Sequence, residues 1–217
     1  MWWALAAAWA APPVDVRPVA APWDTPQRWA AHRAAKGLGD DPLACRPLWA
    51  DHALVCLRQV DGAGLRWVTS SEVAGWGMTL DSLFASVTTE AEARLSELET
   101  VPVEGLGSYR RLVSGEGWAV AVALHADELV AELGPDLRVA IPAGTVALAW
   151  PAGSSELDKA MAVGVVELAE EQPGEVSRTV FRWDGEALVP FAEAKAAVTS
   201  EAGAANGDEQ GKKKPHR

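Results

Sequence analysis

The 217-residue chain lacks most of the features from which an activity can be predicted. It has two cysteines and one tyrosine, and its 30 acidic residues exceed its 19 Lys and Arg residues, which gives a net charge of −11. An acidic surface repels nucleic acid and anionic membranes, so we expect no nucleic-acid partner. No stretch reaches the about 20 apolar residues that a helical span requires, so we expect no stable membrane span.

Recognisable catalytic motifs are also missing. The chain has no H-E-x-x-H, G-x-S-x-G or C-x-x-C motif, and its paired glycines lack the spacing of a phosphate loop. Asp51 and His52 are neighbours, and Glu128 follows His125 by three residues, but no motif supplies a nucleophile or the three or four ligands of a zinc site. We therefore predict no catalytic residue, metal or cofactor. The alternative is a hydrolase-like enzyme whose dispersed residues, for example Asp51, His52 and His125, converge only in the fold.

The N-terminus indicates export. An apolar run from Trp2 to Ala11 contains Ala8-Trp9-Ala10, which is typical of a secretory signal and its cleavage site. No Lys or Arg precedes the run, and a short apolar helix or an N-terminal strand would also fit. Cleavage after Ala20 or Ala21 is an alternative. We expect an exported protein, periplasmic or extracellular, with a cytoplasmic location as the alternative.

Composition divides the chain into three parts. Residues 1–21 are interpreted as the signal segment and the start of a Pro-rich linker, "PPVDVRPVAAPW". Residues 24–198 are interpreted as a single α+β region, which could divide into subdomains 24–77 and 79–198. Residues 199–217 are rich in Gly, Ala and charge, which predicts a disordered tail.

Hydrophobic periodicity and capping residues predict helices that alternate with hairpins. The clearest helix starts at Thr79 and has apolar residues three and four apart from Leu80 to Leu98. Another helix is expected to start at Thr25, and two more are expected over 117–134 and 155–171. Strands are expected over 43–70 and near Tyr109, and hairpins over 137–150 and 177–191. From Tyr109 onward the expected order is β-α-β-β-α-β-β. The predicted fold is α+β, with a largely antiparallel sheet and helices packed on one face.

The stretch "CRPLWADHALVC" contains both cysteines and is predicted to form a hairpin. A two-residue loop, Ala50-Asp51, would place Cys45 opposite Cys56, whereas a longer loop would shift this register. Two buried free thiols are the alternative, but an even cysteine count in an oxidising compartment favours pairing. We therefore predict a disulfide between Cys45 and Cys56. Pro47 cannot donate to a sheet ladder, so its strand should lie at an edge or carry a bulge.

The order and spacing of several segments resemble the YtpQ-like family of uncharacterised bacterial proteins. The segments are "PLWADHALVCLRQVDGAGLRWVTSSEV", "ARLSEL", "ETVPVEG", "LRVAIPAGTVALAW" and "FRWDGEALVPF", and they span about residues 43–195. The resemblance implies an α+β fold, an unknown function and no transferable catalytic residues. The function expected from the sequence is an exported, non-catalytic binding or structural module that recognises another protein through its sheet or its acidic helix.

Overall fold

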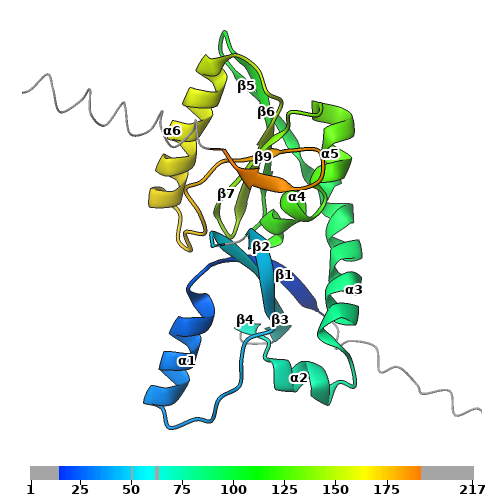
Figure 1. Cartoon of the computed structure of the whole chain (residues 1–217), viewed down its shortest axis with the longest axis vertical. Coiled ribbons are helices and arrows are strands. Elements are labelled where there is room, and N and C mark those ends of the chain that lie inside the picture. The colour runs from blue at the N-terminus through cyan, green and yellow to red at the C-terminus, as the bar shows by residue number, and fades with distance from the viewer. Residues whose placement is uncertain (1–14, 50, 62–63, 192–217) are drawn as a thin grey trace, which may run out of the picture.

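A four-stranded antiparallel sheet forms the N-terminal part of the molecule (Figure 1). The computed structural model describes residues 15–49, 51–61 and 64–191. Strand β3 (Ala53–Asp61) pairs with β1 (Val16–Pro22) on one side, while β2 (Cys45–Trp49) and β4 (Gly64–Trp67) pair with successive parts of β3 on the other. The proposed signal segment before residue 15 and the tail from residue 199 lie outside the described residues.

Strand β1 corrects the prediction of a linker before residue 24. Its seven residues all pair with β3, and most of its side chains are buried. The Val60 amide donates to the Asp15 carbonyl. In this register the backbone amides and carbonyls of the odd-numbered β1 residues point toward β3, and those of the even-numbered residues point away. Pro18 and Pro22 therefore stand where an amide would point away from β3, and they remove no ladder hydrogen bond.

Three helices accompany this sheet: α1 (Thr25–Ala35), α2 (Ser70–Gly75) and α3 (Leu80–Glu92), the last continuing into η1 (Ala93–Glu97). The α3 prediction is confirmed, because the Thr79 hydroxyl accepts the Ser82 amide at 3.1 Å and Phe84, Val87 and Ala91 are buried. Helix α1 stands away from both sheets in Figure 1. Of its residues, only Thr25 is buried.

A six-stranded antiparallel sheet forms the rest of the molecule, in the order β10-β9-β7-β8-β6-β5. Its strands are β5 (Glu99–Val103), β6 (Gly107–Val113), β7 (Arg138–Ala143), β8 (Val146–Trp150), β9 (Phe181–Trp183) and β10 (Leu188–Pro190). Its helical segments are η2 (Trp118–Val120), α4 (Ala121–Leu124), α5 (Ala126–Leu133) and α6 (Ser155–Glu171). The single helix expected over 117–134 is therefore three short segments, and the non-helical backbone of His125 separates α4 from α5.

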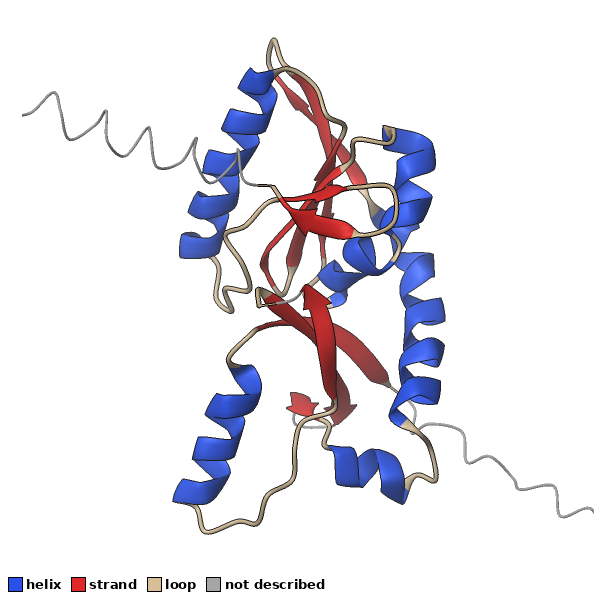
Figure 2. Ribbon diagram, in the orientation of Figure 1, coloured by secondary structure: helices blue, strands red, loops and turns tan. Residues whose placement is uncertain are grey.

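The α+β class and the antiparallel sheet are confirmed, but helices cover both faces of the six-stranded sheet and not one (Figure 2). Leu148 and Trp150 of β8 face α6, whereas Ala147 and Ala149 of the same strand face the core that contains α4 and α5. A strand covered on both faces is apolar throughout. Every residue of β7 and β8 is buried, including Arg138, which stacks on Phe191.

The two sheets share one core. A single cluster of buried side chains extends from Val55 and Leu57 of β3 to Val139 and Ile141 of β7. At the junction, the ring of Trp49 stacks on that of Phe181, with 3.7 Å between centroids. Among the described residues, no helix has both the length and the apolar composition needed to cross a membrane.

Candidate binding cleft

The two cysteines face each other across β2 and β3. Cys45 pairs with Cys56, and the structure joins them in a disulfide with a Cα–Cα distance of 4.0 Å. The Leu57 amide donates to the Ala44 carbonyl, so the cysteines form the neighbouring non-hydrogen-bonded pair. Such pairs bring the two backbones closer together than hydrogen-bonded pairs do, which suits a cross-strand disulfide.

The loop between the cysteine strands differs from the two-residue loop expected. Trp49 pairs with Ala53, so three residues lie between the strands, and Asp51 adopts a positive φ of 61°. The register shifts by one residue between Pro47 and Trp49, and this bulge restores the pairing that the longer loop would have displaced. Pro47 therefore lies on an edge strand that also carries a bulge, which confirms that prediction.

The histidines do not assemble a common polar site in the described part of the chain. His52 contacts the edge of the Phe181 ring, with centroids 5.5 Å apart, beside the exposed Asp51. His125 is buried, with Nδ1 3.0 Å from Glu128 Oε1 and Nε2 2.9 Å from the Thr88 carbonyl of α3. His125 thus links α5 to α3. Nor do the described residues contain a group of three or more His, Cys, Asp or Glu side chains that could hold a metal ion.

A cleft lies between α1 and the outer face of the four-stranded sheet, and we call it the tryptophan cleft. Its volume is about 660 Å³, within the range of small-ligand and side-chain sites. Trp29 of α1 and Trp67 of β4 are its large aromatic residues. The full lining consists of Pro22, Thr25, Arg28, Trp29, His32, Trp67, Gly174, Glu175 and Val176.

The disulfide belongs to the sheet face beneath this cleft. Cys56 packs with Val19, Ala21 and Leu54 in a small buried cluster. The half-buried side chains of Trp23, Cys45 and Trp67 pack against that cluster. Trp67 of the cleft therefore packs against a cluster of small side chains that a covalent cross-link holds together.

A smaller hollow of about 230 Å³ adjoins the tryptophan cleft, and we call it the arginine pocket. The two hollows share Pro22, Trp67 and Gly174. The remaining lining consists of Val19, Ala20, Ala21, Arg58, Leu65, Gly115, Gly117, Gly144, Thr145 and Pro173. Arg58 is the only charged residue of this lining, and its guanidinium carbon lies 4.9 Å from the centroid of the Trp67 ring.

Unlike most arginines in the described part of the chain, Arg58 forms no ion pair with a carboxylate of the described residues. Its Nη2 donates to the Leu65 carbonyl, and its buried Nε has no hydrogen-bond acceptor among the described residues. Burial lowers the pKa of Arg58 below its usual value, because desolvation disfavours the charged form. The side chain still carries its charge at neutral pH.

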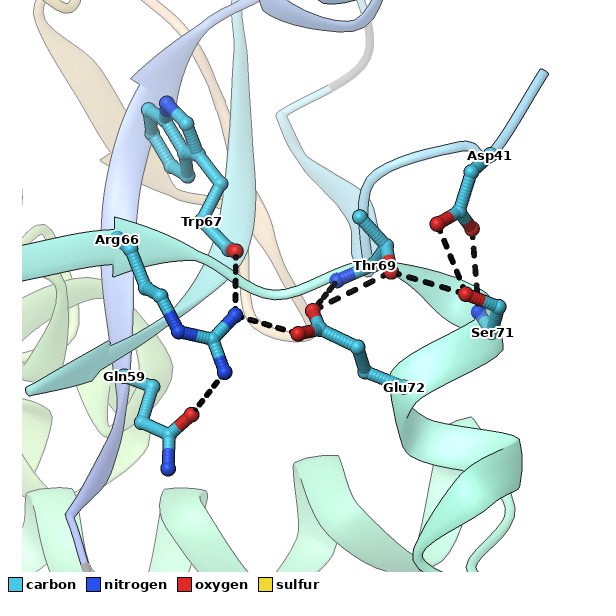
Figure 3. A network of polar contacts seen from close by, with 7 residues as sticks. All are labelled: Asp41, Gln59, Arg66, Trp67, Thr69, Ser71 and Glu72. Carbon is cyan, nitrogen blue, oxygen red and sulfur yellow. Dashed lines mark hydrogen bonds and ion pairs between the residues drawn. The ribbon is translucent and has the colours of Figure 1, made fainter. Parts of the chain in front are cut away.

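A polar network connects β4, the strand of Trp67, to α2 (Figure 3). Arg66 donates to Glu72 and Gln59, and Glu72 accepts the Thr69 amide at 2.9 Å. Arg66 therefore connects β4 to α2. Because side chains alternate across a strand, the neighbouring Trp67 projects from the other face, where it lines the cleft.

Asp41 connects this network to α1. Its carboxylate accepts the Ser71 hydroxyl at 2.8 Å, and its carbonyl accepts the Trp29 indole N–H at 3.0 Å. Slight burial raises the pKa of Asp41, but hydrogen bonds led by that from Ser71 outweigh it and lower the pKa below 3.8. One residue therefore holds the α1 wall of the cleft in place relative to the β4 wall.

Sequence reasoning found the cysteine pair but not the cleft above it. The cleft unites Pro22, Trp29, Trp67 and Gly174, which come from four separate segments, and no local spacing indicates that they meet. The one available signal was the number of tryptophans, since 11 occur beside a single tyrosine. No protein-family model, curated protein or solved structure matches the chain.

Proposed function

We propose that the protein is an exported, non-catalytic module that binds another protein in the tryptophan cleft. The observation that carries the proposal is the isolation of α1. This 11-residue helix buries only Thr25, yet its Trp29 is anchored to Asp41 and its free side forms one wall of an aromatic cleft. Helices of this length gain most of their stability from packing, so a partner that covers α1 would stabilise it.

The chemistry of the cleft also supports binding. Tryptophan and arginine are enriched at the energetically dominant positions of protein interfaces, and both residue types line the two hollows. The pairing of Cys45 with Cys56 supports export, because disulfides persist mainly in oxidising compartments.

Capture of a partner that depends on the cleft tests the binding function. The full-length protein and two variants, Trp29→Ala and Trp183→Ala, would be used to capture proteins from the native envelope fraction. Trp183 is the matched control, because it is also half-buried but lines a different hollow beside Trp49. We expect one protein to be retained by wild type and by Trp183→Ala and to be lost with Trp29→Ala. Equal capture by all three proteins, or no specific capture, would overturn the proposal.

N-terminal sequencing of the native protein tests export. Ala20 and Ala21 lie inside β1 and are buried, so cleavage after either would remove most of a strand that pairs with β3. We therefore expect cleavage near Ala10. An intact Met1 in protein isolated from the cytoplasm would contradict export without contradicting binding in the cleft.

A further inference from the structure

We propose that the tryptophan cleft and the arginine pocket together bind an acidic segment of the partner, with a carboxylate on Arg58 and a neighbouring apolar side chain beside Trp29 and Trp67. This inference rests on the proposed function, because it names the chemistry of the partner that the function requires. Two features of the described residues support it: Arg58 forms no ion pair with a carboxylate among them, and Arg58 is the only charged residue that lines a pocket beside Trp67.

The two hollows differ in charge. In the tryptophan cleft Arg28 pairs with Asp24 at 2.7 Å, and Glu175 of the lining pairs with Arg178, so the charges that line this cleft are already balanced. The lining of the arginine pocket instead contains one charged residue, Arg58, and no carboxylate. Charge complementarity therefore favours an acidic group in the arginine pocket and an apolar side chain in the tryptophan cleft.

Arg58 offers the specific contact. Stacking on Trp67 and the bond to the Leu65 carbonyl hold its guanidinium in a fixed plane. A charged guanidinium binds a carboxylate through charge-assisted hydrogen bonds, and no carboxylate among the described residues forms an ion pair with Arg58. By contrast, Arg17 and Arg178 each contact two carboxylates of the chain.

The arginine pocket also leaves room for a peptide backbone. Gly115 is part of its lining, and a Cβ added to Gly115 would meet no atom within 4 Å, so the pocket is open at this point. The adjoining tryptophan cleft has a volume of about 660 Å³, against about 230 Å³ for the arginine pocket, and can take the side chain of a residue next to the acidic one. Together the hollows fit a short extended segment with one acidic and one apolar residue.

Selection of peptides on the intact protein tests this chemistry. A phage-displayed library of random heptapeptides would be selected on the full-length wild type, on Arg58→Gln and on Arg182→Gln. The last variant is the matched control, because it removes the same charge from an exposed residue of β9. We expect wild type and Arg182→Gln to enrich peptides with Asp or Glu next to an apolar residue, and Arg58→Gln to lose the acidic preference.

A synthetic peptide from the selection then gives a quantitative readout. Replacing its acidic residue with the matching amide should weaken binding to wild type by about tenfold, the usual effect of a charged hydrogen bond. The same replacement should have no effect on binding to Arg58→Gln, while Arg58→Lys should retain part of the preference. The measurement on wild type needs no altered protein, so poor folding of a variant leaves the test intact.

The remaining outcomes separate the two proposals. Peptides that require Trp29 but show no acidic preference would overturn the acidic-segment inference and leave the proposed function standing. An absence of Trp29-dependent peptides would count against both. If sedimentation velocity shows a dimer that Trp29→Ala abolishes, the cleft binds a second copy of the chain and the inference is overturned. If a synthetic peptide of residues 192–217 competes for the cleft, the occupant is the chain's own tail and the inference is likewise overturned.

Discussion

The two sheets differ in how completely they are covered. Helices pack on both faces of the six-stranded sheet, and every residue of β7 and β8 is buried. The four-stranded sheet packs its inner face into the shared core, but its outer face carries only a small cluster around Cys56 and the open tryptophan cleft. The six-stranded sheet therefore acts as a scaffold, and the less completely covered four-stranded sheet presents the candidate site.

The position of the disulfide follows from this difference. A small sheet whose outer face buries only a small cluster gains less hydrophobic stabilisation than a larger sheet covered by helices on both faces. The cross-link between Cys45 and Cys56 joins strands of the less covered sheet and so restricts its unfolded chain. The cleft can then remain open to a partner without loss of the sheet that supports it.

Removing the contact between the sheets should have the largest effect. Phe181 is fully buried and stacks on Trp49, so Phe181→Ala is expected to lower the free energy of unfolding by about 4 kcal/mol. Urea unfolding followed by tryptophan fluorescence and by far-UV circular dichroism measures the loss. Because the sheets share one core, both signals should change in a single transition. The exposed Val113 provides a control, and Val113→Ala should unfold like wild type. Separate transitions for the two signals would show that the sheets are independent.

Removing the disulfide should have the next largest effect. The cysteines are 11 residues apart, and a loop of this length predicts a loss of about 3 kcal/mol for the Cys45→Ala, Cys56→Ala double variant. Urea unfolding of the oxidised and reduced wild type is the control and should show a similar difference. Mass spectrometry of non-reduced native protein should find the two cysteine peptides linked. Two freely alkylated thiols would contradict both the cross-link and the argument for export.

The elements with a strong local pattern could be predicted from the sequence. The apolar stripe and Thr79 cap of α3 indicated a helix, and Asp184-Gly185 indicated the turn between β9 and β10. Strand β1 was missed because its prolines suggested a linker, and only the pairing with β3 shows that they face away from the ladder. The second helical layer was missed although "LRVAIPAGTVALAW" is almost continuously apolar, which is the pattern of strands covered on both faces.

The site was harder to predict than the fold. The cysteine pairing followed from strand register, although the bulge that preserves this register has no sequence signal of its own. That Arg58 forms no ion pair with a carboxylate among the described residues depends on which carboxylates reach it in space, and no sequence pattern indicates this. Tertiary arrangement alone determines both features.

The contact between the four-stranded sheet and the rest of the core can be tested at a single glycine. Gly117 has a φ of 87°, and a Cβ added to it would lie 2.7 Å from Cγ1 of Val19 in β1. Backbone strain and displacement of β1 should together cost about 2 kcal/mol in Gly117→Ala, measured by urea unfolding. Gly115 lines the same pocket with no neighbour that a Cβ would meet, so Gly115→Ala should be close to wild type. Equal stability of the two variants would contradict the close approach of β1.

The smallest effect should come from Asp41, which connects the two walls of the cleft. The pKa of Asp41 is lowered in the folded protein. Its contribution to folding stability is therefore fully present at pH values above the ordinary pKa near 3.8, and it is lost as the pH falls through the lower pKa of the folded state. Because the carboxylate is largely solvated, Asp41→Asn should cost no more than about 0.5 kcal/mol at pH 7. The difference from wild type should shrink below about pH 4, where the wild-type carboxylate also becomes protonated. Asp40→Asn is the matched control, because Asp40 is the exposed neighbouring residue. Stability curves of the three proteins between pH 2 and pH 7 measure the effect, and identical curves for the two variants would show that Asp41 does not hold α1 in place.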